Sequence, residues 1–308
     1  MEGRSNLRIL VSGASGFIGT ELVAQLEAGG HTVLRLVRAK PRNPSEVLWS
    51  PATGALDPTV LETVDAVINL SGASTGRIPW TRSYKQKIRD SRVDPTTTLA
   101  RAIDGALHPP TVFLSASAVG YYGDRPGEVL TEQSARGAGY FPDVVGVWEA
   151  AAQAVPKAVP STKVRVVTFR TGIVVGRGGA FTPLIALTRL GLGSRFGSGR
   201  QNWPWISLYD EAAAIRYLLT SKLSGPVNLT APTPATTDEI TSYLAKRMRR
   251  WYLFRIPAWV ISGLLGDAGR DLLLTDQNVT PERLTADGFT FRYATVESAI
   301  DAMFARAE

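Results

Sequence analysis

The sequence predicts an α/β protein: a Rossmann-type, doubly wound parallel sheet with a smaller α/β lobe interleaved on its C-terminal side. Short aliphatic runs alternate with helix-like stretches through the first half, and a glycine-rich turn follows the first run directly. After Gly176 this alternation gives way to a glycine- and proline-rich texture. We therefore expect a dinucleotide-binding domain over residues 1–175 and a smaller substrate-side lobe over residues 176–308, interleaved with the main sheet.

The first elements follow from local patterns. Leu7–Val11 is a short aliphatic run typical of a buried strand, and Phe17–Ala28 is an amphipathic stretch that predicts a helix. Gly29 and Gly30 offer the left-handed cap that ends such a helix. Thr32–Val37 predicts the next strand.

The later elements of the first half repeat the alternation. Val64–Leu70 and Thr111–Ala116 predict two more buried strands, and the long helical stretch Thr81–Ala106 separates them. A further helix over Val144–Ala154 leads into a strand at Val164–Arg170. Strands joined by helices in this way favour a parallel sheet covered on both faces.

Composition excludes several classes of protein. The 308 residues contain no cysteine and two histidines, which excludes disulfides, thiolate chemistry and a histidine-rich metal centre. Without an apolar run of ~18–20 residues, we expect no membrane association and a cytoplasmic protein. The net charge of +7 is scattered rather than arranged as a stripe, so we expect an anionic small ligand as partner and no nucleic acid.

The glycine-rich turn has the spacing Gly-x-x-Gly-x-x-Gly and opens the first helix. Glycine there permits a tight turn and close approach of a pyrophosphate, while the helix N-terminus offers free N–H groups. The alternative is a glycine-rich turn without a ligand. We expect the cofactor phosphates at Gly13, Ser15, Gly16, Phe17, Ile18 and Gly19.

The second strand indicates which dinucleotide binds. It ends in Arg38 with no Asp or Glu to accept hydrogen bonds from a ribose 2′-hydroxyl, and Arg35 is a second candidate. A guanidinium can pair with a 2′-phosphate, so NADP(H) is favoured over NAD(H). Alternatively, Arg38 is a solvated strand end. Further cofactor contacts are expected at Asp65, beside the adenine, and along the cleft at Leu70, Ser71, Gly72 and Ala73.

Motifs across almost the whole chain carry a family resemblance. They include Val11–Gly19, Asn69–Ala73, Ser115–Gly123, Trp148–Ala151, Arg170–Gly172, Asn228–Pro232, and Pro281-x-x-Leu284 followed by Gly288-Phe289. With them the chain resembles the extended short-chain dehydrogenase/reductases, and more narrowly the atypical, NAD-dependent epimerase/dehydratase-like branch called the epimerase family, which has its own C-terminal domain. The resemblance also implies a cofactor contact at Arg170.

In the wider superfamily, a Ser orients the substrate, and a Tyr exchanges a proton with help from a Lys four residues later. Ser117 matches the serine. By spacing, however, Val144 or Val145 replaces the tyrosine, Trp148 or Glu149 stands at the lysine position, and Lys157 lies too far along. The standard pair is therefore predicted to be absent.

Substitute catalytic groups are expected close by. Tyr121 and Tyr122 follow Ser117, and either could supply the acid. The alternatives are that both tyrosines are packing aromatics and that Ser117 caps or satisfies backbone groups. Ser207 stands where the family pattern has a histidine. Substrate contacts are expected at Lys85, Arg92, Glu149, Arg200 and Trp205. For Lys85 and Arg92 the alternative is a solvated or helix-packing role, and for Glu149 a structural pair with an arginine.

Two functions remain open from the sequence. The first is an NADP(H)-dependent oxidoreductase or epimerase-like enzyme acting on a small polar metabolite, with a nucleotide-linked sugar as one candidate. The second is a non-catalytic NADP(H)-sensing protein, which the missing Tyr-x-x-x-Lys pair favours. The resemblance implies a monomer or a homodimer that pairs through the helices at 81–106 and 144–154.

Overall fold

The computed structural model describes residues 6–155 and 164–305, so Lys157 lies outside the described residues. Seven parallel strands form the central sheet in the order β3-β2-β1-β4-β5-β7-β11, and the predicted doubly wound Rossmann-type sheet is confirmed. Neighbouring strands are in parallel register, with Ile9 of β1 opposite Val33 of β2 on one side and Ala66 of β4 on the other. The strands are β1 (Arg8–Ser12), β2 (Thr32–Val37), β3 (Glu46–Leu48), β4 (Ala66–Asn69), β5 (Val112–Ala118), β7 (Arg165–Thr171) and β11 (Gly225–Leu229).

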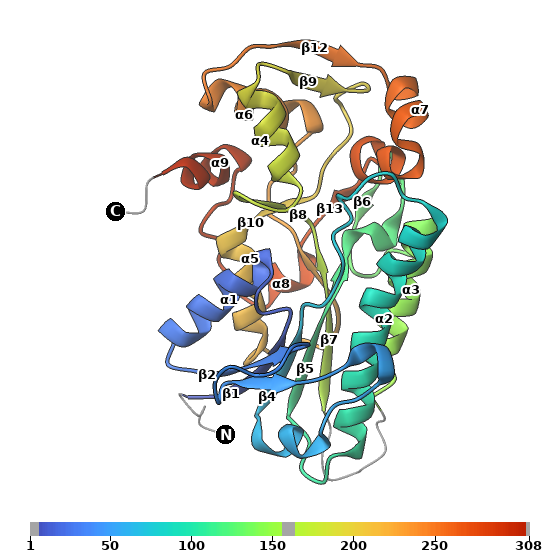
Figure 1. The fold of residues 1–308 in the computed structure, drawn as a ribbon. Helices are drawn as coiled ribbons and strands as arrows, with labels where there is room; N and C mark the ends of the chain where they lie inside the picture. The colour runs from blue at the N-terminus through green and yellow to red at the C-terminus, as the bar shows by residue number, and fades with distance from the viewer. Residues whose placement is uncertain (1–5, 156–163, 306–308) are drawn as a thin grey trace.

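Helices cover both faces of this sheet (Figure 1). On one face lie α1 (Phe17–Ala28) and α5 (Leu208–Leu218), and on the other lie α2 (Arg82–Gly105) and α3 (Tyr140–Gln153). Leu22 and Leu26 of α1 pack in one core cluster with the sheet, and Leu99 of α2 packs in the other. All three side chains are fully buried, so each helix contributes an apolar stripe to a core layer.

The smaller lobe lies at the end of the molecule where β7 runs into β8 (Figure 1). Two short parallel pairs form there, β8 with β10 and β9 with β12. Phe181, Phe196, Trp203 and Trp205 fill its own core. Its elements are β8 (Ile173–Val175), α4 (Phe181–Arg189), β9 (Gly193–Phe196), β10 (Trp205–Ser207), α6 (Thr237–Arg247), β12 (Tyr252–Ile256), α7 (Ala258–Gly269) and α9 (Val296–Phe304).

The chain passes between the lobe and the sheet more than once. Residues beyond 176 return to the sheet as α5 and as β11, which pairs with β7. The boundary at 175/176 stays a prediction. The remaining elements are η1 (Pro51–Thr53), η2 (Pro58–Thr63), η3 (Val119–Tyr122), the pair β6 (Val129–Leu130) and β13 (Asn278–Val279), η4 (Arg270–Leu274) and α8 (Glu282–Ala286).

No helix within the described residues combines the length and apolar character needed to cross a membrane.

Candidate functional site

The candidate site is the crevice above the carboxyl ends of β1 and β4. From β1 the chain builds outward through β2 and β3, and then crosses back to start the other half of the sheet at β4. This reversal of strand order is the position at which open parallel sheets bind ligands, because the loops on the two sides diverge there.

The Gly13–Gly19 turn connects β1 to α1 at this crevice. Gly13 has φ +70°, and a Cβ added to it would lie 2.6 Å from the Leu70 carbonyl oxygen. A Cβ on Gly19 would lie 2.2 Å from the Gly13 carbonyl oxygen. Packing therefore requires both glycines, whatever binds above them.

Gly16 differs from these two glycines. A Cβ there would meet a single described atom within 4 Å, the Gly13 carbonyl oxygen at 3.1 Å. Gly16 is the N-cap of α1, and within the described chain no side chain caps this helix end and its first turn carries no acidic residue. The first backbone N–H groups of α1 are thus left for an anion.

Phe17, the first residue of α1, packs against the loop that follows β8. A Cβ on Gly176 or Gly178 would come within 2.6 Å of the Phe17 ring. Because these positions are glycines, the loop backbone can pack directly against the Phe17 ring. This contact connects the smaller lobe to the glycine-rich turn.

The two arginines of the second strand have different surroundings. Arg35 points toward α1 and forms an ion pair with Glu27 at 2.8 Å. Arg38 follows the last residue of β2 and is exposed, with no partner among the residues described. Arg38 is therefore the guanidinium left at the carboxyl end of the strand, and Arg35 is engaged elsewhere.

Asp65 lies away from the crevice, contrary to expectation. It precedes β4 at the amino edge of the sheet, and its Oδ2 accepts a hydrogen bond from the Arg8 backbone N–H at 2.8 Å. Leu70–Ala73 follow β4 at the opposite edge. Since β4 separates the two positions, the structure does not bring Asp65 together with the other predicted cofactor residues.

A buried polar network supports the floor of the crevice, and the sequence analysis did not identify it. The Ser12 hydroxyl donates to Asn69 Oδ1 at 2.6 Å, and the Asn69 amide donates to the Thr96 hydroxyl at 2.8 Å. The Trp148 indole also donates to Thr96, at 3.0 Å. These bonds connect β1, β4, α2 and α3. The available signal was an asparagine at the end of an apolar strand, since buried amides need partners.

A second network lies at the carboxyl ends of β5 and β7. Ser117 Oγ donates to Glu149 Oε1 at 2.6 Å, and the Arg170 guanidinium binds both Glu149 oxygens at 2.8 and 2.9 Å. Arg170 also donates to the Tyr122 hydroxyl at 2.9 Å and lies 3.5 Å from the centroid of the Tyr121 ring. Each nitrogen of Arg170 thus bonds within the protein, and Glu149 is the arginine-paired carboxylate that the alternative interpretation described.

Electrostatics in this network follow from burial and pairing. Burial by itself would lower the pKa of Arg170, but the hydrogen bonds and charge of Glu149 raise it above the usual value. Burial raises the pKa of Tyr122 to about 12, against the opposing effect of Arg170. Tyr122 therefore keeps its proton at physiological pH, and its hydroxyl is held by Arg170 and by Asn228.

Lys85 joins α2 to the smaller lobe. Its ammonium forms an ion pair with Asp267 of α7 and lies 4.8 Å from the Tyr140 ring centroid. Nearby, burial and the charge of Asp267 raise the pKa of Asp271 to about 6. Arg92 lies on the same helix as Lys85, beside Gly72, and so reaches the crevice from the side of β4.

Two expected substrate residues come from the smaller lobe. Trp205 is 1% exposed, and its indole donates to the Thr233 carbonyl at 3.0 Å, so it packs in the core and is inaccessible to a substrate. Arg200 is exposed on the loop after β9. Ser207, at the position of the family's histidine, caps α5 by accepting a hydrogen bond from the Asp210 backbone N–H at 2.9 Å.

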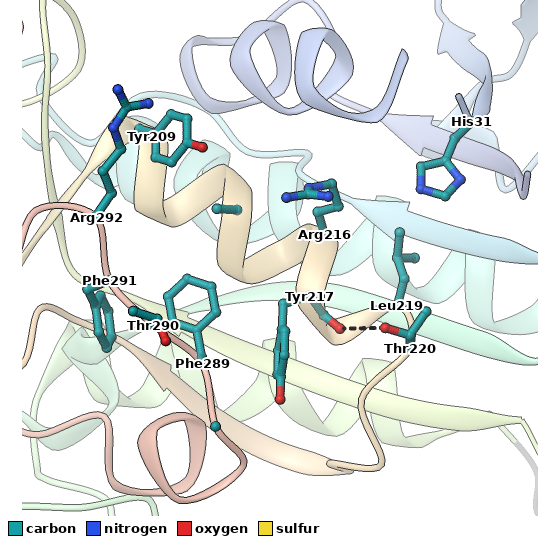
Figure 2. A pocket seen from close by; sticks show the side chains of 12 residues that line it. His31, Tyr209, Arg216, Tyr217, Leu219, Thr220, Phe289, Thr290, Phe291 and Arg292 are labelled. Atoms are coloured by element: carbon teal, nitrogen blue, oxygen red, sulfur yellow. Dashed lines mark hydrogen bonds between the residues drawn. The ribbon is translucent and has the colours of Figure 1, made fainter. Parts of the chain in front are cut away.

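A pocket of about 680 Å³ lies apart from the crevice, between α5 and residues 288–292 (Figure 2). His31, Arg216, Tyr217 and Phe289 are among its lining residues, and no predicted site residue lines it. Burial and the charge of Arg216 lower the pKa of His31. The motif Gly288-Phe289 is thus part of this wall and of the core beneath it. Among the described residues, no group of three or more His, Cys, Asp or Glu could hold a metal ion.

Comparison with known proteins gives matches along nearly the whole chain. Residues 9–229 match the NAD dependent epimerase/dehydratase family, and residues 256–303 match a domain of unknown function, DUF1731. Epimerase family protein Mb2239 of Mycobacterium bovis is 38% identical over 298 residues, covering 96% of this chain and 97% of the relative. Human epimerase family protein SDR39U1 is 33% identical over 299 residues, covering 96% and 98% of the two chains.

Solved structures resemble the chain over the same extent. Human SDR39U1 (isoform 2), solved with NADPH, has a TM-score of 0.85 at 32% identity and covers 96% of this chain and 98% of its own. The nucleoside-diphosphate sugar epimerase of Corynebacterium glutamicum has a TM-score of 0.77 at 31% identity, covering 96% of this chain and 57% of its own. MoeE5, solved with UDP-glucuronic acid and NAD, has a TM-score of 0.74 at 21% identity over 96% and 98% of the two chains, and shares the fold.

Proposed function

The chain belongs to the NAD-dependent epimerase/dehydratase family, and from this premise we propose an NADP(H)-dependent oxidoreductase or epimerase that acts on a small polar metabolite. One observation carries the proposal. The N-terminus of α1 has Gly16 as its N-cap, carries no side-chain cap within the described chain, and opens into the crevice between β1 and β4. Such a helix end is suited to a dinucleotide pyrophosphate.

The cofactor we propose is NADP(H), and the residues present fit it. The pyrophosphate binds at Gly13–Gly19, and Arg38 binds the 2′-phosphate because no carboxylate ends β2. Human SDR39U1, solved with NADPH, supports this choice. The nicotinamide end then lies across the sheet, toward Ser117 and the end of β5.

In this proposal the cofactor supplies hydride transfer when bound, and the chain orients the substrate and moves a proton. Ser117 is 3% exposed and its hydroxyl hydrogen is donated to Glu149, so it would meet a substrate hydroxyl as an acceptor, at the inner end of the site. Tyr121 is the proposed proton donor, because it is half-buried and its hydroxyl has no partner in the described part of the chain. Arg170 supports both residues, through Glu149 and through its contact with the Tyr121 ring.

The substrate is a small polar metabolite, with a nucleotide-linked sugar as one candidate. Proteins of the same fold, such as MoeE5, have been solved with such sugars. A non-catalytic NADP(H)-sensing protein is the second candidate, favoured by the valines and the Trp148-Glu149 pair that stand where Tyr-x-x-x-Lys is expected on α3. A cytoplasmic location and a monomer or homodimer complete the proposal.

The cofactor proposal is tested by calorimetry on Arg38→Ala. Losing a charge-assisted contact to the 2′-phosphate costs about 1.5–3 kcal/mol. We therefore expect roughly ten- to a hundredfold weaker NADPH binding with little change for NADH. Arg35→Ala is the matched control, because Arg35 is paired with Glu27, and it should leave NADPH affinity unchanged. Equal affinity of the unmodified protein for NADPH and NADH would contradict the proposal.

Hydride transfer to or from a panel of metabolites separates the enzyme from the sensor. Absorbance at the NADPH band follows each reaction. Turnover with any polar carbonyl or hydroxyl compound supports the enzyme. Tight NADPH binding without turnover across the panel supports the sensor.

A further inference from the structure

Arg92 holds an unusual position at the crevice. It lies on α2, half-buried against the loop after β4, so that a Cβ on Gly72 would lie 3.4 Å from the Arg92 Cζ. Its Cζ lies 5.3 Å from the centroid of the Trp148 ring. The guanidinium makes one hydrogen bond within the described chain, from Nη1 to the Ile88 carbonyl at 2.9 Å, on the preceding turn of its own helix.

The two arginines that reach this part of the molecule differ in their counter-charges. Arg170 is bound by both oxygens of Glu149. Arg92 forms no ion pair with any carboxylate of residues 6–155 or 164–305, and burial lowers its pKa to about 10 while Tyr140 and Tyr84 act in the opposite direction. A guanidinium that is partly withdrawn from water and has no counter-charge favours a ligand that supplies one.

The groups around Arg92 leave its positive charge free to bind an anion. Lys85, two turns earlier on α2, is already paired with Asp267. The neighbouring wall is aromatic, because Trp80, Tyr140 and Phe141 pack together beside α2, with Trp80 and Tyr140 centroids 5.7 Å apart. A planar guanidinium beside such a wall matches the two oxygens of a carboxylate or phosphate.

We propose that Arg92 binds an anionic group of the substrate, and that the substrate class is therefore a small metabolite carrying a carboxylate or phosphate. This inference rests on the proposed function, since it assigns the space beside the cofactor to a substrate. Arg92 enters from the side of β4 and α2, whereas Arg38 lies beyond β1 at the end of β2. The two guanidiniums thus approach the crevice from different sides, Arg38 from the end of β2 and Arg92 from α2.

Calorimetry on the NADPH-saturated protein tests the inference with two probes, benzoate and phenyl phosphate. The unmodified protein should bind at least one, and the tighter probe identifies carboxylate or phosphate as the preferred anion. Arg92→Gln should weaken that probe about ten- to a hundredfold. Arg92→Lys keeps the charge but cannot form two parallel hydrogen bonds to one anion. Its affinity for the probe should therefore lie between those of the unmodified protein and Arg92→Gln.

Arg89→Gln is the matched control. Arg89 lies one turn earlier on α2, is exposed and contacts Asp90 at 3.2 Å, so its loss should leave probe binding unchanged. NADPH affinity, measured in the same variants, should also stay unchanged. Equal probe binding by Arg92→Gln and the unmodified protein, or no binding of either probe by the unmodified protein, would overturn the inference.

Loss of NADPH affinity in Arg92→Gln would also overturn it, since Arg92 would then belong to the cofactor site. Failure of the unmodified protein to bind NADPH would instead count against the proposed function. In that case the probes, titrated into the protein without cofactor, still decide whether Arg92 binds an anion. Thermal unfolding of each variant checks that it is folded. If Arg92→Gln does not fold, Arg92→Lys still tests the inference.

Discussion

Tyr121 and Tyr122 are neighbours in sequence with opposite environments. Tyr122 is fully buried and bonds to Arg170 and Asn228 at 2.9 and 2.7 Å. Tyr121 is half-buried, and its ring stands nearly perpendicular to that of Tyr122, with centroids 5.5 Å apart. Of the two, Tyr121 is the one whose hydroxyl has no partner in the described part of the chain, whereas the Tyr122 hydroxyl is bonded on both sides.

Substitution of these residues should separate the two roles once a substrate is known. Ser117→Ala and Tyr121→Phe should each lower turnover by a large part of the ~10²–10⁴-fold that general acid–base assistance provides, with NADPH affinity preserved. Tyr122→Phe should mainly lower the free energy of unfolding, by about 2–4 kcal/mol, because it removes one neutral and one charge-assisted hydrogen bond. Steady-state kinetics and urea unfolding measure these effects. Near-normal turnover in both Ser117→Ala and Tyr121→Phe would refute the catalytic assignment.

At the scale of single elements, α1 carries the clearest functional consequence. Its first turn is uncapped in the described structure, and Gly16 there has room on one side. A capping side chain would satisfy the N–H groups but would also occupy the space for an anion. The backbone N–H groups of the first turn of α1 therefore remain free to bind an anionic ligand.

Gly16→Val should abolish cofactor binding while the protein stays folded. The added side chain meets one protein atom closely, the Gly13 carbonyl oxygen, but it occupies the approach to the N–H groups of α1. Gly105→Val, at the end of α2, is the control, because a Cβ there has no described neighbour within 4 Å. Calorimetry with NADPH and far-UV circular dichroism make the comparison. Normal NADPH affinity in Gly16→Val would show that the cofactor phosphates do not bind at the Gly13–Gly19 turn.

Local patterns predicted elements well where both ends carry a signal. The helix Phe17–Ala28 and the strand Thr32–Val37 match the structure residue for residue, since glycines and the change of periodicity mark their limits. The helix expected from Val144 begins at Tyr140 instead, after Gly139 with φ +121°. The strand Glu46–Leu48 is three residues long, too short for an alternation to be visible.

The sequence predicted the site less completely, because its contacts join distant residues. Ser117 and Glu149 are 32 positions apart in the sequence, and no local pattern predicts the hydrogen bond between them. Asp65 is expected beside the adenine because it opens the fourth strand, but the start of β4 lies at the amino edge of the sheet, opposite the crevice. Trp205 is expected among the substrate contacts, whereas tertiary packing buries it.

At the scale of the whole molecule, one buried carboxyl makes stability depend on pH. Glu211 of α5 is 0% exposed, its Oε1 accepts a hydrogen bond from Thr171 at 2.7 Å, and its Oε2 has no partner among the residues that the structure describes. Burial raises the pKa of Glu211 to about 8, despite the bond from Thr171. Between its unfolded pKa of 4.5 and about 8, the folded protein binds more protons than the unfolded chain.

The free energy of unfolding should therefore fall as pH rises from 4.5 through about 8, by on the order of a few kcal/mol. Glu211→Gln removes the titration while keeping an acceptor for Thr171. It should be more stable than the unmodified protein at pH 8.5 and close to it at pH 5. Urea unfolding at both values measures the difference. Parallel pH profiles for the two proteins would show that Glu211 does not titrate in this range.

The last strand of the sheet has a consequence for how the protein is made. β11 lies beside β7, but the chain between them builds β8, α4, β9, β10 and α5 first. On the ribosome, the edge of β7 stays unpaired until residues 225–229 emerge, and an open strand edge is prone to pair with other chains. A nascent chain that ends at residue 175 is therefore expected to expose this edge of β7, which β11 covers only after β8, α4, β9, β10 and α5 have been synthesised.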